Sequence, residues 1–169
     1  MYPNGGSMPQ WTLFEKDFHA IDQVLFDLIE RTHALSVHLV DRSGQLITTA
    51  GRAPDFDVTA FASLVAADFT ANAELCLLMG QDGVNAVVSE GPARTVYSCL
   101  LADRAILCVL FDRGSTLGLV RLRTQRAVAV LDPVFRGLFE KVGLIQPVEG
   151  TTQDFAAAAG REVDALFGE

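Results

Sequence analysis

Histidine side chains are the usual acid–base and metal-binding groups at neutral pH, and this chain has three of them: His19, His33 and His38. Their spacing matches neither HxxxH nor HExxH, the patterns that place two imidazoles on one metal ion. His19 and His33 fall in or beside a predicted helix, where we expect them to lie on its faces. The histidines therefore predict neither a metal centre nor a catalytic site.

The thiols and the glycine motifs also predict no catalysis. Cys76, Cys99 and Cys108 lie in apolar stretches without CxxC spacing, which is typical of small core residues in a reducing cytosol. No GxSxG or Rossmann fingerprint is present, and the segment after Gly114 lacks the Gly-Lys-Ser/Thr of a phosphate-binding loop. We expect the Asp-Arg pairs at 103–104 and 112–113 to be turn residues. The sequence thus predicts no active site, metal or cofactor.

The composition is that of one packed, acidic domain. The chain has 169 residues, 50% of them hydrophobic, which is enough for one core and too few for two ordinary domains. The formal charge of −8 and the lack of a dense Lys/Arg cluster argue against binding to nucleic acid or to an anionic membrane. No segment approaches the length of a membrane span, and residues 1–10 do not resemble a secretion signal. We therefore expect a cytoplasmic protein.

Periodicity predicts the elements that must carry any function. Apolar residues recur every three or four positions from Leu13 to about Arg31, which indicates a helix. A second helix is predicted over 57–79, with Asp55 or Asp57 as its cap and Gly80 at its end. The five predicted strands are 36–40, 46–50, 84–90, 95–101 and 105–111, and the first two form a hairpin around Gly44.

The polarity of the strands predicts their places in a sheet. The strand 105–111 (AILCVLF) is apolar on both faces, as expected for a central strand with a layer on each side. The segment 84–90 (VNAVVSE) is more polar and suits an edge. With the order α-β-β-α-β-β-β-α, we predict an α/β (α+β) fold in three layers, with one mostly antiparallel five-stranded sheet between helices.

The final helix, from Thr116 to about Val142, contains two unusual residues. Gly118 lies in its first turn, where glycine is about 1 kcal/mol worse than alanine. We therefore expect a close approach to a neighbouring backbone that a Cβ would prevent. Pro133 lacks an N–H and predicts a kink after Asp132.

Three segments together carry a family resemblance: VHLVDRSGQLITTAG, FASLVAADFTANAEL and VLFDRGSTLGLVRLR. They resemble the roadblock (dynein light chain) family, and most closely its MglB branch, over about residues 13–142. The resemblance implies a roadblock/profilin-like sandwich and a homodimer whose edge strands join into one sheet. It also implies that the paired second helices hold one Ras-like small GTPase of the MglA type. We divide the chain into a disordered N-terminus (1–11), a roadblock domain (12–142), a linker (143–153) and a C-terminal amphipathic segment (154–169).

The second predicted helix has two unlike sides on a helical wheel. Its large apolar residues share the side expected to pack on the sheet: Val58, Phe61, Val65, Phe69, Cys76 and Met79. The opposite side is small and weakly polar: Ser63, Ala66, Ala67, Thr70, Ala71 and Glu74. A solvated helix usually shows Lys, Glu and Gln, so this row favours close contact with a partner. We assign it to GTPase binding, with packing inside the dimer and plain exposure as the alternatives.

Asp68 and Asn72 conflict with this assignment because they fall on the apolar side of the wheel. Burying either side chain without a partner costs about 1–3 kcal/mol. We therefore expect hydrogen-bond partners for both, or a wet seam between the two helices of a dimer, and we favour the seam.

The edge strand is the expected dimer contact. An edge leaves backbone N–H and C=O groups unpaired, so we expect antiparallel pairing of residues 84–90 with a symmetry mate. The residues assigned to this contact are Val84, Ala86, Val88 and Glu90.

The last segment has the pattern of a partner-binding helix. Residues 143–153 have the composition of a mobile linker. Beyond them, Phe155, Val163, Leu166 and Phe167 gather on one side of a helix that is too short to be stable alone. We expect this segment to fold on a partner, with a solubilising tail or a segment docked on its own domain as the alternatives. The resemblance implies that the partner is the GTPase.

The resemblance implies a non-enzymatic regulator that stimulates GTP hydrolysis without inserting an arginine, in cell polarity or gliding motility. If the chain inserted an arginine into the nucleotide site of the GTPase, Arg52 in the loop before the second helix would be the candidate. Two alternatives stay open: a roadblock adaptor that binds a GTPase without stimulating it, and a PAS- or GAF-like sensor. A sensor needs a cavity lined by polar residues, and no polar insertion interrupts the central strands.

Overall fold

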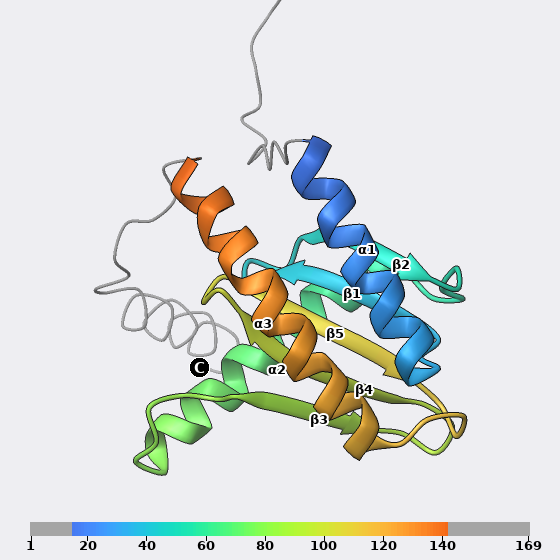
Figure 1. The fold of residues 1–169 in the computed structure, drawn as a ribbon. Helices are drawn as coiled ribbons and strands as arrows, with labels where there is room; N and C mark the ends of the chain where they lie inside the picture. Colours follow the sequence, from blue (N-terminus) through green and yellow to red (C-terminus); the bar gives the residue numbers. More distant parts are fainter. Residues whose placement is uncertain (1–14, 142–169) are drawn as a thin grey trace, which may run out of the picture. The chain divides into compact units, whose positions relative to one another are not determined.

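The computed structural model describes residues 15–141 and shows a five-stranded antiparallel sheet between helices (Figure 1). The strand order is β2-β1-β5-β4-β3. Helices α1 and α3 cover one face of the sheet, and α2 covers the other (Figure 1). The elements are α1 (Glu15–Thr32), β1 (Ser36–Asp41), β2 (Leu46–Gly51), α2 (Val58–Leu78), β3 (Ala86–Glu90), β4 (Thr95–Leu101), β5 (Ala105–Phe111) and α3 (Leu117–Lys141).

The predicted fold class, layer arrangement and element order are confirmed. The chain divides into two compact units, Met1–Leu138 and Phe139–Glu169, and the first contains the whole sheet. Of the second unit, the structure describes only the last residues of α3. The predicted N-terminus (1–11), linker (143–153) and C-terminal segment (154–169) lie outside the described residues.

The core is built around β5, whose seven residues are all buried. Successive strand residues point to opposite faces of a sheet. Val40 and Ile106 pack with residues of α2, so Leu39 and Leu107 face the layer of α1 and α3. The predicted central position of this strand, with a layer on each face, is therefore confirmed.

The turns follow the expected chemistry, except at one glycine. Gly44 has a φ of 92° in the β1–β2 turn, and Thr116 caps α3 by accepting a hydrogen bond from the Leu119 N–H to its Oγ1 at 3.3 Å. The prediction for Gly118 is wrong: a Cβ there would meet no described atom within 4 Å. The first turn of α3 is exposed at this position and does not press on the sheet, and nothing in the described structure explains the glycine. Helix α3 continues through Pro133 as one element.

Candidate partner-binding surface on helix α2 and strand β3

Helix α2 is fixed to the sheet at its start. Asp57 caps it, because its carboxylate accepts hydrogen bonds from the N–H groups of Thr59 (2.9 Å) and Ala60 (3.1 Å). One turn later, the helix backbone at Ser63 comes so close to the β1–β2 turn that a Cβ on Gly44 would lie 3.1 Å from the Ser63 Cα. Glycine at position 44 therefore allows both the positive φ of this turn and the close approach of α2.

The inner side of α2 combines alanines with large apolar residues. Ala62, Ala66 and Phe69 are buried and form a core cluster with sheet residues that include Val40 and Ile106. The assignment of Ala66 to the outer, partner-binding row is therefore wrong. The helical wheel placed Phe61, Val65 and Phe69 correctly on the inner side, but it missed that the small Ala62 and Ala66 are buried beside them.

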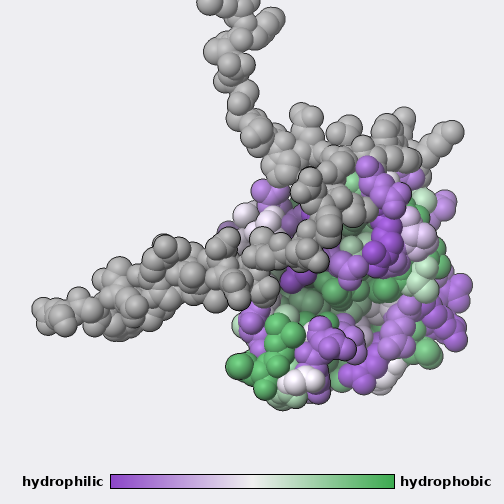
Figure 2. Space-filling view, turned by 90° about the vertical axis from the view of Figure 1, so that its left-hand side faces the viewer, coloured by the Kyte–Doolittle hydropathy of each residue, from purple (hydrophilic) through white to green (hydrophobic). Residues whose placement is uncertain are grey.

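The outer side of α2 is more apolar than predicted. Leu64 is 69% exposed and Leu78 is 84% exposed, and Leu75 is exposed between them. Met79 was expected on the inner side, but it is the C-cap residue and is exposed. Figure 2 shows hydrophobic surface gathered toward its lower left, where the end of α2 lies. Apolar side chains in such a row are typical of a surface that another molecule covers.

The predicted outer row is only partly exposed. Ser63, Ala67, Ala71 and Glu74 are exposed. Thr70 is half-buried, and its hydroxyl donates to the Ala66 carbonyl at 2.9 Å. The leucines that dominate the exposed side were missed, because periodicity alone does not say which side of a helix that is apolar all round faces the core.

Asp68 and Asn72 satisfy one another. The Asn72 amide donates to the Asp68 carbonyl at 2.8 Å and to its Oδ1 at 2.9 Å. Asp68 is exposed and Asn72 is half-buried, so the placement of Asp68 on the buried side was wrong. Of the two expected solutions, the described residues show the hydrogen-bonded one. Asp68 and Glu74 are the two charged residues of α2, so this surface is acidic at its margins.

A fork-shaped ion pair links the loop before α2 to the β3–β4 turn. Arg94 donates to both carboxylate oxygens of Asp55, at 2.7 and 2.8 Å. The hydrogen bonds from Arg94 lower the pKa of the Asp55 carboxyl to about 2. The Arg94 and Asp55 side chains are 44% and 66% exposed, so the ion pair contributes little to the stability of the fold.

Strand β3 is an edge of the sheet, as predicted. It pairs with β4 in the register Ala86↔Cys99 to Glu90↔Thr95, and its other side has no strand among residues 15–141. Val88 and Glu90 are exposed, and Ala86 is half-buried. Val84 lies before the strand, which begins at Ala86 and not at residue 84 as predicted, and it packs on the core cluster beneath α2.

A buried histidine under the start of α2 was not singled out by the sequence. The His38 ring lies within 2.9 Å of the Ser36 Oγ at Nε2 and within 2.9 Å of the Thr49 Oγ1 at Nδ1. The ring packs against Phe61 at a tilt of 55°, with centroids 5.0 Å apart, and Phe56 packs on both rings. Burial lowers its pKa to about 4, so it is neutral at pH 7. Both ring nitrogens contact hydroxyls and not carboxylates, so this cluster is a satisfied core site and not an acid–base triad.

The other chemistry-bearing side chains are also structural. Burial raises the pKa of both Cys99 and Cys108 to about 12, so neither is a thiolate at neutral pH. Among the residues described, no group of three His, Cys, Asp or Glu side chains could hold a metal ion. The space between the sheet and α2 is filled by the core cluster.

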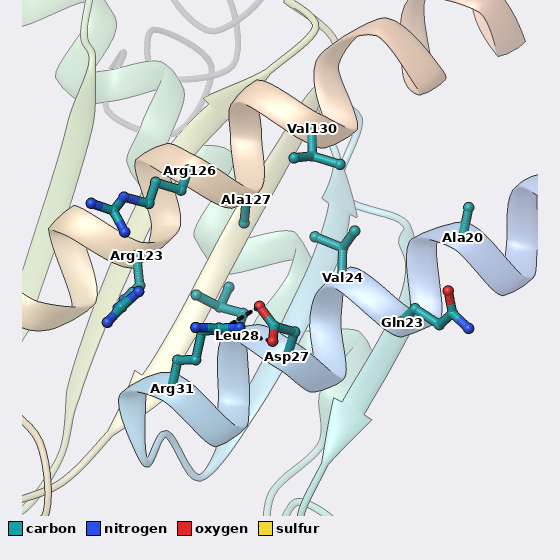
Figure 3. Close-up of a pocket in the computed structure, with 10 residues that line it drawn as sticks. All are labelled: Ala20, Gln23, Val24, Asp27, Leu28, Arg31, Arg123, Arg126, Ala127 and Val130. Atoms are coloured by element: carbon teal, nitrogen blue, oxygen red, sulfur yellow. Dashed lines mark hydrogen bonds and ion pairs between the residues drawn. The ribbon is translucent and has the colours of Figure 1, made fainter.

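An open groove of about 500 Å³ lies on the other face of the molecule, between α1 and α3 (Figure 3). Leu28 and Ala127 are buried at its base. Arg31, Arg123 and Arg126 line one end of it. No local pattern indicates their proximity, because they lie on two helices far apart in the chain.

Helix α2 is the one helix among residues 15–141 whose length and composition would allow it to cross a membrane, so the expectation that no segment approaches the length of a span is wrong. Few of its residues are buried. Core helices of soluble proteins can have the same length and composition, and the inner side of α2 packs on the sheet.

Solved structures of similar proteins share this fold over nearly their whole length. Myxococcus xanthus MglB is 35% identical, with 75% of this chain and 96% of that chain covered and a TM-score of 0.69. The chain belongs to the roadblock family, close to MglB. The gliding protein MglB of Thermus thermophilus is 26% identical, with 76% and 97% covered and a TM-score of 0.69. An MglB structure with a tetrameric arrangement is also 26% identical, with 78% and 99% covered and a TM-score of 0.71. No protein-family model and no curated protein matches the sequence.

Because the chain belongs to the roadblock family, α2 is one of the helices that cover the sheet in this fold. A roadblock/LC7 domain from Streptomyces avermitilis, at 20% identity and a TM-score of 0.62, shows the same fold. Among residues 15–141, the outer side of α2 is exposed, and β3 is one of the two edge strands of the sheet, the other being β2.

Proposed function

We propose that this chain is a homodimeric regulator that binds a Ras-like small GTPase of the MglA type and stimulates its GTP hydrolysis. The observation that carries the proposal is the exposed apolar side of α2 in a chain close to MglB. Ala67 and Ala71 form a flat strip there between the larger Leu64 and Leu75. Such a strip suits a partner that approaches the helix closely, with basic groups beside Asp68 and Glu74.

The chain would act without a catalytic residue of its own. GTP hydrolysis requires an oriented water and positive charge at the transferring phosphoryl group, and a regulator can reposition the groups that the GTPase already holds. The exposed outer side of α2 carries no cationic side chain that could enter a nucleotide site. Arg52 is exposed in the loop before α2 and is the residue to test for an inserted arginine.

The proposed dimer forms through β3. Two copies pairing antiparallel at Ala86–Glu90 would satisfy the free backbone groups of this edge and bring the two α2 helices to the same side of a joined sheet. The exposed residues at the end of α2, including Leu77 and Met79, would be partly covered by that contact.

The decisive experiment is a single-turnover GTPase assay with an MglA-type GTPase. The native chain should accelerate hydrolysis, and Ala67→Arg should weaken binding by about tenfold or more, as expected when bulk and charge enter a close contact. The matched control is Ala129→Arg, which places the same change on an exposed position of α3. Arg52→Ala should leave the acceleration intact.

The outcomes separate the alternatives. Binding without acceleration identifies an adaptor. Equal loss in Ala67→Arg and Ala129→Arg, or no loss in either, would place the docking surface elsewhere. A small molecule that stays bound in native mass spectrometry would favour a sensor.

A further inference from the structure

The groove between α1 and α3 combines an apolar floor with unpaired positive charge. Val24 and Val130 add apolar surface to the groove at the end away from the arginines (Figure 3). At the other end, the Arg31 guanidinium is bonded to Asp27 at 2.7 Å. Arg123 and Arg126 have no ion-pair partner among residues 15–141.

Of these two arginines, Arg123 gives the stronger indication that an acceptor group binds in the groove. Its Nε is buried without a hydrogen-bond partner among the described residues. A buried unsatisfied donor is costly, and more so on a charged group. In a chain with a net charge of −8, two free arginines beside an apolar floor form a site for an acidic, amphipathic segment.

We propose that this groove is the docking site of the chain's own C-terminal segment, residues 154–169. The segment has four acidic residues and one basic residue, and its apolar side chains Phe155, Val163, Leu166 and Phe167 share one side of a helix. Its apolar side would lie on the floor at Leu28 and Ala127, and its acidic flanks would face Arg123 and Arg126.

Chain length permits this docking. Arg126 lies about 22 Å before the end of α3, measured along the helix. The residues 142–153 span up to about 40 Å when extended, so the segment can return to the groove. The other terminal segment, residues 1–14, contains no acidic side chain and does not complement the arginines.

Docking would compete with binding of the same segment to a partner, because both use the same apolar side chains. The groove would then hold the segment when no partner is present. Docking involves the chain alone and needs no GTPase, so its failure leaves the proposed function untouched.

The test is NMR spectroscopy of the full chain labelled with ¹⁵N. The double variant Leu166→Ser/Phe167→Ser removes the anchors, and Arg126→Glu reverses an exposed charge at the groove. Both should shift the amide signals of Ala20–Arg31 and Arg123–Val130. Arg126→Glu should lower the docked-to-free ratio about three- to fivefold, and added salt should lower it in the native chain. Arg113→Glu, an exposed charge outside the groove, is the control and should change the ratio less than about twofold.

Three outcomes would overturn the inference. The groove signals could stay unchanged in the anchor variant, which would show that the segment does not lie there. The shifts could fall on α2 and β3 instead, which would place the segment on the partner surface. Deletion of residues 1–14, rather than loss of the anchors, could move the groove signals, which would make that segment the occupant.

Discussion

Acid should destabilise this protein through His38, the buried ring beneath the start of α2. Burial lowers its pKa from 6.5 to about 4, so the folded chain binds this proton less readily than the unfolded chain. Below about pH 6.5 the unfolded state binds more protons at this site, and stability must fall as the pH falls. The loss continues until the folded-state pKa is reached, and the contribution is fully present above about pH 6.5.

The size of the effect follows from the shift. Each pKa unit corresponds to about 1.4 kcal/mol, so the full loss is about 3 kcal/mol, of which about 2 kcal/mol appears between pH 7 and pH 4.5. The assay is urea unfolding at several pH values, followed by circular dichroism. The His38→Gln variant cannot titrate, and it keeps polar groups near the Ser36 and Thr49 hydroxyls. Its stability at neutral pH should be lower, but its slope against pH should be smaller than that of the native chain.

The control is His19→Gln, which removes an exposed histidine of α1. It should keep the native slope. If His38→Gln and the native chain have the same slope between pH 6.5 and pH 4, the folded and unfolded chains bind the His38 proton equally, and burial does not lower the pKa of this ring. The account of a neutral, hydroxyl-bonded core histidine would then be refuted.

Three further predictions test the packing of α2 and the edge of the sheet. Ala66→Leu should lower the free energy of unfolding by about 1–3 kcal/mol, because the larger side chain overpacks the core. Ala67→Leu, at an exposed position, should change it by less than about 0.5 kcal/mol. Equal effects of the two variants in urea unfolding would contradict the burial of Ala66 against the sheet. Gly44→Ala should destabilise the chain by about 1 kcal/mol or more, since it strains a positive φ and presses on Ser63; an unchanged melting temperature would show that the loop yields freely. Val88→Lys on β3 should shift the chain toward monomer in light scattering at micromolar concentration, and an unchanged mass would place the dimer contact elsewhere.

The fold was predictable because several local signals agreed. Alternation and polarity placed β5 at the centre and β3 at an edge, and the turn at Gly44 and the cap at Asp57 were correct. The error at Gly118 has a different origin. Glycine in a helix indicates that a side chain is unnecessary or excluded, and sequence alone does not distinguish a close neighbour from open space.

The candidate surface was harder to predict than the fold. A helical wheel finds the apolar side of an amphipathic helix, but α2 is apolar on both sides, so its large residues indicated the wrong centre. Ala66 was placed outside and Met79 inside for this reason. Contacts between distant segments, such as Arg94 with Asp55 or the arginines of the groove, leave no local pattern.

The exposed leucines of α2 limit how a single copy could bind a partner. Burying a fully exposed leucine gains about 1.5–3 kcal/mol, and the side chains of Leu64, Leu75 and Leu78 are already partly covered. Their combined gain is therefore of the same order as the loss of translational and rotational freedom on association, which costs about 4–15 kcal/mol. One α2 helix would bind weakly by this term alone. Two α2 helices brought together by pairing at β3 would double the apolar area at a single association cost. The dimer proposed at the sheet edge and the GTPase site proposed on α2 are thus linked: Val88→Lys should weaken GTPase binding even though the residue lies on the strand and not on the helix.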